Sequence, residues 1–171
     1  VRKMNIDFLS ASAHKIYGPK GVGLLYIRKG IKVEPLLHGG GHEFGLRSST
    51  ENTAGIAGFA KSVEICKREI NSEAKRLTVL RDYLIKEMLK IPNTRLNGHA
   101  TKRIYNNTNF SFFGIEGESL IIHLDMQGIA ASTGSACSTK SLKPSHVLTA
   151  IGLSHVQAHG SLRLTYGRST T

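Results

Sequence analysis

Apolar residues recur at helical spacing through residues 55–90, and this is the clearest pattern in the chain. Pro92 and Asn93 predict the end of that helix. Cys66 falls on the apolar stripe, which favours a small core side chain over a reactive thiol. The stripe consists of positions three or four apart that would share one helix face: Ile56, Phe59, Val63, Cys66, Ile70, Ala74, Leu77, Leu80, Leu84 and Met88.

Shorter patterns on either side of this helix predict a mixture of strands and helices. The last of them alternates, so Arg163 and Thr165 should share the strand face opposite Leu162 and Leu164. This mixture predicts an α/β fold. The predicted elements are a buried strand over 22–27, strands over 109–113 and 161–166, and helices over 118–127 and 144–151.

Composition changes this picture little. The 171 residues suit one domain or a large part of one. No stretch approaches the roughly 18 unbroken apolar residues of a membrane helix, and no signal peptide is visible. The two cysteines have different surroundings, which does not suggest a disulfide framework and favours a reducing, cytoplasmic setting. The chain starts without Met and runs directly into residues 6–9, which resemble the middle of a fold, so we expect an incomplete chain.

The formal net charge of +11 raises nucleic-acid binding as a possibility. The basic residues follow the long helical pattern, and a solvated helix face explains such spacing better than a nucleic-acid surface. No recognition helix, zinc finger or RNA-binding aromatic motif is present. A basic, non-enzymatic module that binds nucleic acid or a partner protein stays open as an alternative. The residues concerned are Lys61, Lys67, Arg68, Lys75, Arg76, Arg81, Lys86 and Lys90.

Lys15 is the first candidate for covalent chemistry. An amine in a compact polar turn can form a Schiff base with an aldehyde cofactor. Ser12 and His14 flank it at alternate positions, and their hydroxyl and imidazole groups suit a phosphate. Lys20 competes for the same role, but its turn lacks both neighbours.

Cys137 is the second candidate. It lies among serine and threonine residues over 132–139 and not on an apolar face, which is unusual because free cysteine is usually buried. A thiol in a run of small residues can act as a nucleophile, and the nearby Lys140 would favour its thiolate. A fortuitous surface thiol is the competing interpretation.

Arg163 and two histidines are weaker candidates. The guanidinium of Arg163 could form a bidentate pair with a carboxylate, with a structural ion pair as the alternative. His155 and His159 are four residues apart, as helical metal ligands can be, but no third ligand is evident. The sequence therefore predicts no metal site.

Taken together, these motifs resemble cysteine desulfurases, pyridoxal-phosphate enzymes of the aminotransferase class V group with the type I fold. The length of the segment between Cys137 and Pro144 resembles the group that serves iron–sulfur assembly and nitrogenase maturation. The resemblance covers essentially the whole chain. Its motifs are the cofactor-lysine motif at 12–21, the glycine loop at 38–50, the active-cysteine loop at 132–139 and the carboxylate-binding strand at 161–168.

For the cofactor, pyridoxal 5'-phosphate, the resemblance implies four residues. Lys15 would hold the cofactor and later move protons, and Ser12 and His14 would contact its phosphate. Thr50 would reach the phosphate bound by the partner subunit, which implies a homodimer. The sequence departs from the family at Ser49, where the family usually has Gly.

For the substrate, the resemblance implies that Arg163 clamps the carboxylate of L-cysteine and that Cys137 attacks its sulfur. The products would be L-alanine and a persulfide on Cys137, which would supply a sulfur-acceptor or iron–sulfur scaffold protein. A lyase acting on selenocysteine or a desulfinase acting on cysteine sulfinate is the alternative within the same group.

The resemblance also implies a domain organisation. Residues 1–55 would be the end of the large cofactor domain, 56–94 a connecting helix, and 95–171 a small α/β domain. In the family, roughly the first half of the enzyme lies upstream of the cofactor lysine and carries the groups that stack on the cofactor ring and pair with its nitrogen. We therefore expect the 171-residue chain alone to be inactive on free cysteine.

Overall fold

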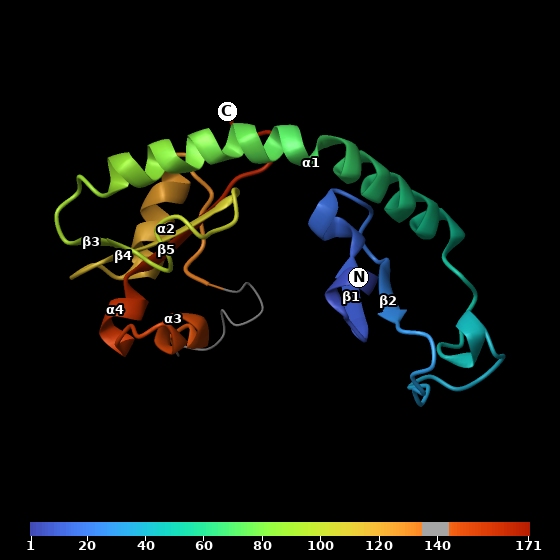
Figure 1. Ribbon diagram of the computed structural model, residues 1–171. Helices are drawn as coiled ribbons and strands as arrows, with labels where there is room; N and C mark the ends of the chain where they lie inside the picture. Colours follow the sequence, from blue (N-terminus) through green and yellow to red (C-terminus); the bar gives the residue numbers. More distant parts are fainter. Residues whose placement is uncertain (135–143) are drawn as a thin grey trace. The chain divides into compact units, whose positions relative to one another are not determined.

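The computed structural model describes residues 1–134 and 144–171. These residues divide into two compact units, Val1–Ile70 and Asn71–Thr171. Helix α1 (Thr53–Met88) runs through both units and confirms the long helix predicted from the apolar stripe (Figure 1). The three-part division at residues 55 and 94 stays a prediction.

The first unit is built on a two-stranded antiparallel sheet. Strand β1 (Phe8–Ser12) pairs with β2 (Gly23–Ile27), with Phe8 opposite Ile27 and Ser12 opposite Gly23. Three short 3-10 turns accompany the sheet: η1 (Arg2–Met4), η2 (Ala13–Ile16) and η3 (Glu43–Gly45).

Strand β2 confirms the predicted strand but not its predicted burial. Leu24 is 44% exposed and Leu25 is 58% exposed. An apolar run of this kind suits a strand that is covered on both faces. Among the described residues only β1 pairs with it, and a sheet of two strands cannot cover these side chains.

The second unit contains a three-stranded antiparallel sheet in the order β3-β4-β5. The strands are β3 (Thr94–Leu96), β4 (Asn107–Phe112) and β5 (Ser161–Thr165). Phe110 of β4 lies directly opposite Leu162 of β5. Strands β4 and β5 confirm the predictions for 109–113 and 161–166.

The described part of this unit has three helices after α1: α2 (Gly117–Met126), α3 (His146–Ala150) and α4 (His155–His159). The predicted stop after α2 is confirmed, because Gly128 adopts a φ of +77° and its N–H donates to the Asp125 carbonyl over 2.8 Å. Helix α3 is shorter than the predicted span of 144–151.

The core of the second unit lies on one face of its sheet. Phe110, Phe112 and Leu162 are buried there, at alternate positions of β4 and β5. Figure 1 shows α1 and α2 beside this sheet. The stripe of α1 reaches the core only at its far end, whereas Ile56, Val63 and Ile70 are about half exposed. The packing residues of the two helices are Leu84, Ile85, Met88, Leu120, Ile121 and Leu124.

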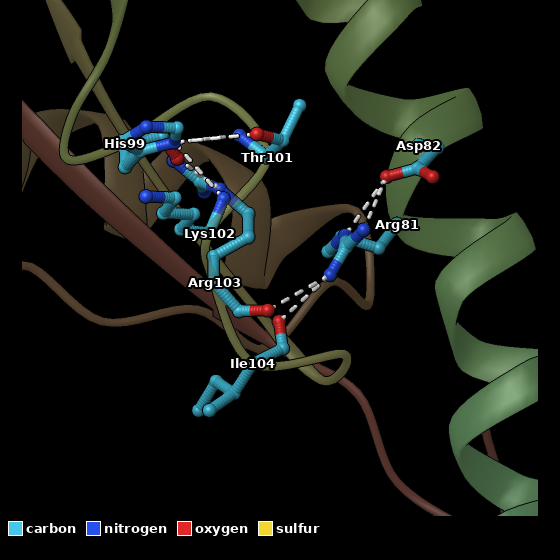
Figure 2. A network of polar contacts seen from close by, with 7 residues as sticks. All are labelled: Arg81, Asp82, His99, Thr101, Lys102, Arg103 and Ile104. Atoms are coloured by element: carbon cyan, nitrogen blue, oxygen red, sulfur yellow. Dashed lines mark hydrogen bonds and ion pairs between the residues drawn. The ribbon is translucent and has the colours of Figure 1, made fainter.

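Arg81 corrects the interpretation of the basic residues as a wholly solvated face. Its side chain is buried and links α1 to the loop before β4 (Figure 2). The guanidinium donates to the carbonyls of Ile104 over 3.1 Å and Arg103 over 3.3 Å, and to Asp82 Oδ1 over 2.8 Å. The loop itself is closed by His99, whose Nδ1 accepts from the backbone N–H of Lys102 over 2.9 Å.

Candidate functional site

The turn that carries Lys15 grows directly out of strand β1. Ala13 is fully buried at its start, and its N–H donates to the Val22 carbonyl over 3.1 Å. The Ala13 carbonyl in turn accepts from the N–H of Gly18 over 2.9 Å. His14 and Lys15 are exposed. The chain therefore anchors Ala13 and leaves the two predicted site residues beside it accessible.

Small residues of α1 let this turn approach the helix closely. A Cβ atom on Gly58 would lie 2.7 Å from Cγ of Pro19, and a Cβ on Gly18 would lie 2.7 Å from Oγ of Ser62. One helical turn further on, the Cys66 thiol faces the Ile16 carbonyl at 3.8 Å. These contacts leave the turn little room to move.

This contact was not predicted from the sequence. Gly58, Ser62 and Cys66 are spaced by four residues and therefore lie along one helix face, and that spacing of small residues is the signal that could have revealed it. Cys66 is half-buried against the turn, in keeping with its interpretation as a small packing side chain.

The residues present fit pyridoxal phosphate. Ser12 occupies the N-cap position of η2, yet its side chain makes no capping hydrogen bond, so the cap does not occupy its hydroxyl. Ser12, His14 and Lys15 are all exposed and follow one another in a single turn. An amine suits an aldehyde, while a hydroxyl and an imidazole suit a phosphate. Lys20, also exposed, has Pro19 and Gly21 as its neighbours and lacks such a donor set.

Thr50 lies at the end of the glycine loop, where it is exposed. The loop is closed by the N–H of Ser48, which donates to the Leu37 carbonyl over 3.2 Å. Ser49 is accommodated without strain: its φ is not positive, and its hydroxyl donates to the Thr50 carbonyl over 3.2 Å. Two non-glycine residues of the loop do adopt a positive φ, Glu43 at +50° and Phe44 at +58°.

Arg163 is half-buried on β5, with its backbone held on both sides. Asn109 of β4 lies opposite it on one side. On the other side its N–H donates to the Ser132 carbonyl over 2.5 Å, and its own carbonyl accepts from the Ser132 N–H over 3.1 Å. Within residues 1–134 and 144–171, no carboxylate forms an ion pair with Arg163.

The predicted site residues are thus divided between the two units. Ser12, His14, Lys15 and Thr50 belong to the first, and Arg163 belongs to the second. Cys137 lies outside the described residues.

Two further observations bear on other kinds of site. The described part of the chain holds no cluster of three or more His, Cys, Asp or Glu side chains suited to a metal ion. It also holds no helix that is long and apolar enough to span a membrane.

Comparison with known proteins gives a consistent result. The family model for aminotransferase class-V matches residues 1–171. Cysteine desulfurase IscS of Methanosarcina thermophila is 56% identical over 171 residues, which cover 100% of this chain and 42% of that protein. Cysteine desulfurase IscS of Clostridium botulinum strain Hall is 56% identical over 174 residues, covering 100% of this chain and 44% of that protein. The chain thus spans less than half the length of these relatives.

Solved structures agree with the sequence comparison. A NifS-like protein superposes with a TM-score of 0.89 at 36% identity, covering 100% of this chain and 44% of that one. A NifS-like protein from Rickettsia africae also superposes with a TM-score of 0.89, at 28% identity, covering 99% of this chain and 44% of that one. The α/β fold is therefore that of NifS-like proteins, and the chain belongs to the aminotransferase class-V family.

Proposed function

We propose that this chain is part of a cysteine desulfurase, which converts L-cysteine to L-alanine and places the released sulfur on Cys137. The observation that carries the proposal is the accessible amine of Lys15, on a turn fixed between β1 and α1. The similarity of the whole chain to proteins named cysteine desulfurase supports it.

The first unit would hold the cofactor. Lys15 would bind the aldehyde carbon of pyridoxal 5'-phosphate, and Ser12 and His14 would donate to its phosphate. When bound, this group supplies the electron sink needed to break the bond between carbon and sulfur. Thr50 would serve the phosphate held by the partner subunit of a homodimer, from its exposed place at the end of the glycine loop.

The second unit would hold the substrate. Arg163 would bind the carboxylate of L-cysteine through two parallel N–H donors, as guanidinium groups bind carboxylates. The Cys137 thiolate would attack the substrate sulfur, so that a sulfur–sulfur bond forms as the carbon–sulfur bond breaks. Lys15 would return a proton to the carbon, and L-alanine would leave. One L-cysteine and one thiol thus become one L-alanine and one persulfide, with no external oxidant.

The persulfide would then pass its outer sulfur to an acceptor, such as a scaffold protein for iron–sulfur clusters. A thiolate nucleophile has to stay reduced between turnovers, which fits a cytoplasmic location. The basic residues give less support to nucleic-acid binding, because several are paired with carboxylates. Lys61 lies 3.0 Å from Glu64 and Lys90 lies 2.7 Å from Glu87.

Two substitutions in the full-length protein test the proposal. Lys15→Ala should abolish the cofactor adduct that borohydride reduces, with Lys20→Ala as the control that keeps it. Cys137→Ser should stop alanine formation and keep the cofactor, with Cys66→Ser as the control that stays active. Continued alanine formation by Cys137→Ser would refute the assigned nucleophile. Turnover of selenocysteine in preference to cysteine would favour the lyase alternative.

A further inference from the structure

Residues 132–134, which we call the stem, run antiparallel to the beginning of β5. Ser132 exchanges both backbone hydrogen bonds with Arg163. The Ser132 hydroxyl also closes the stem on itself, because it donates to the Gly134 carbonyl over 2.7 Å and accepts from the Gly134 N–H over 3.2 Å. A single antiparallel bridge at Ser132 therefore joins the stem to the free side of β5.

Ser161 joins the stem to β5 by a side-chain contact. It is only 1% exposed, and its hydroxyl donates to the Thr133 carbonyl over 3.2 Å. The surroundings are closely packed: a Cβ on Gly117 would lie 2.8 Å from Cγ2 of Thr133 and 2.8 Å from the Ser161 carbonyl oxygen. If the Ser161 hydroxyl were removed, the Thr133 carbonyl would lose its hydrogen bond to a side chain of β5.

The position of the stem matters because the stem leads directly into the segment that carries Cys137. Gly134 precedes Cys137 by three residues in the sequence. Arg163, which would hold the substrate carboxylate, is bonded to the same stem through Ser132. A shift of the stem along β5 would therefore move the start of the cysteine-bearing segment relative to Arg163.

We propose that Ser161 is a positioning residue for sulfur transfer: its hydrogen bond to the Thr133 carbonyl fixes the stem of the cysteine segment in register with Arg163. The inference rests on the proposed function and deepens it. Misplacement of a reacting group by about 1 Å can cost up to a hundredfold in rate. Loss of the Ser161 hydroxyl should therefore slow the attack on sulfur more than it weakens substrate binding.

Ser111 provides a matched control. It is fully buried and lies directly opposite Ser161 in the pairing of β4 with β5. Its hydroxyl accepts from Nδ2 of Asn97 over 2.8 Å, in a hydrogen bond that does not involve the stem. Ser111→Ala and Ser161→Ala thus each remove one buried, hydrogen-bonded hydroxyl from neighbouring positions of the same sheet. Only Ser161→Ala removes a hydrogen bond to the stem.

The experiment uses the full-length protein loaded with pyridoxal phosphate and measures alanine formation in a single turnover at saturating L-cysteine. Ser161→Ala should be about tenfold slower than the wild type, a moderate part of the range expected for misplacement. Ser111→Ala should stay within about twofold of the wild type, and KM for L-cysteine should change little in either variant. Equal single-turnover rates for Ser161→Ala and Ser111→Ala would overturn the proposal.

Ser132→Ala keeps the proposal testable if Ser161→Ala does not fold. Its side chain is only half-buried, and its removal opens the stem at Gly134. The same slowing is expected, and an unchanged rate would count against the proposal. Formation of alanine, and of a persulfide on Cys137, by the wild type tests the proposed function separately. Without wild-type turnover both proposals fall, whereas with it an unaffected Ser161→Ala removes only this one.

Discussion

The hydroxyl of the half-buried Tyr166 is hydrogen-bonded to that of Thr108. Burial raises the pKa of its phenol, while a hydrogen bond with Thr108 acts in the opposite direction. The two hydroxyl oxygens lie 2.7 Å apart, and Thr108 is fully buried. Tyr166→Phe should lower the free energy of unfolding by roughly 1–3 kcal/mol, because the Thr108 hydroxyl stays buried without this partner. Urea denaturation at neutral pH measures the loss, and an unchanged midpoint would contradict it.

The pH dependence of the same variant has a definite sign. Because the folded-state pKa of Tyr166 is raised, the unfolded chain releases its proton first as the pH rises. Stability is complete below the ordinary tyrosine range and falls as the pH passes through that range to the raised pKa. The wild type should therefore lose more stability than Tyr166→Phe between about pH 9 and about pH 11.

The carboxyl of Glu73 should make the stability of the protein depend on pH in the acid range. The hydrogen bond from Arg76 lowers the pKa of its carboxyl, and burial opposes this only partly. Arg76 also donates to the Gly167 carbonyl over 3.1 Å, so the pair supports the end of the described chain. Its contribution is present above the ordinary glutamate pKa and is lost as the pH falls through the lowered one.

The corresponding measurement compares melting temperatures of the wild type and Glu73→Gln. The wild type should melt higher at about pH 7, and the difference should close at about pH 3. Glu64→Gln removes an exposed pair with Lys61 and should change little at either pH. A difference that persists at the lower pH would show that the charge of Glu73 is not its cause.

Arg81 marks the limit of sequence reasoning at the residue scale. Its place in a run of lysines and arginines predicted a solvated side chain, and pairs such as Lys61 with Glu64 do lie on the surface. Arg81 is instead only 7% exposed, because two carbonyls of a distant loop accept its N–H groups. Charge spacing along a helix carries no information about carbonyl groups that the fold brings to it.

Helices and strands with a long pattern of apolar residues could be predicted from the sequence, and very short elements could not. Helix α1 repeats its apolar spacing over many turns, and β4 and β5 carry alternating or apolar runs, so all three could be predicted. Strand β3 (Thr94–Leu96) is too short for any periodicity and exists because it pairs with β4. Strand β2 was predicted correctly, but its predicted burial was not found. An apolar run indicates that a strand is suited to burial, and it does not show that a covering layer is present.

The contact between α1 and the Lys15 turn can be tested as a unit. In Gly58→Val the new Cβ would lie 2.7 Å from Cγ of Pro19, so the turn has to move. We expect a loss of roughly 1–3 kcal/mol in stability and weaker retention of pyridoxal phosphate. Ala57→Val adds a similar side chain at the exposed neighbouring position and has the poorer change in helix propensity. Equal cofactor retention in both variants would contradict a role for this contact.

At the scale of the molecule, the most consequential feature is that apolar side chains of the two-stranded sheet are exposed. Phe8 and Leu25 are about half exposed on β1 and β2. Two-stranded sheets are marginally stable alone, and their free edges and apolar faces promote association. We therefore expect the 171-residue chain, produced by itself, to self-associate in light scattering. The same sheet, given the rest of a full-length class-V protein, would have a layer to pack against.

Leu25→Lys distinguishes the isolated 171-residue chain from the full-length protein, because it should improve the behaviour of the first and destabilise the second. In the 171-residue chain it replaces a 58% exposed apolar side chain of β2 and should reduce association. Val156→Lys, at an exposed position of α4 in the other unit, is the control and should reduce it less. In the full-length protein Leu25→Lys should instead lower the melting temperature by several degrees, because it would put a charge into a covered face. A full-length protein that tolerates Leu25→Lys as well as Val156→Lys would show that this face of β2 stays open to solvent in the whole molecule.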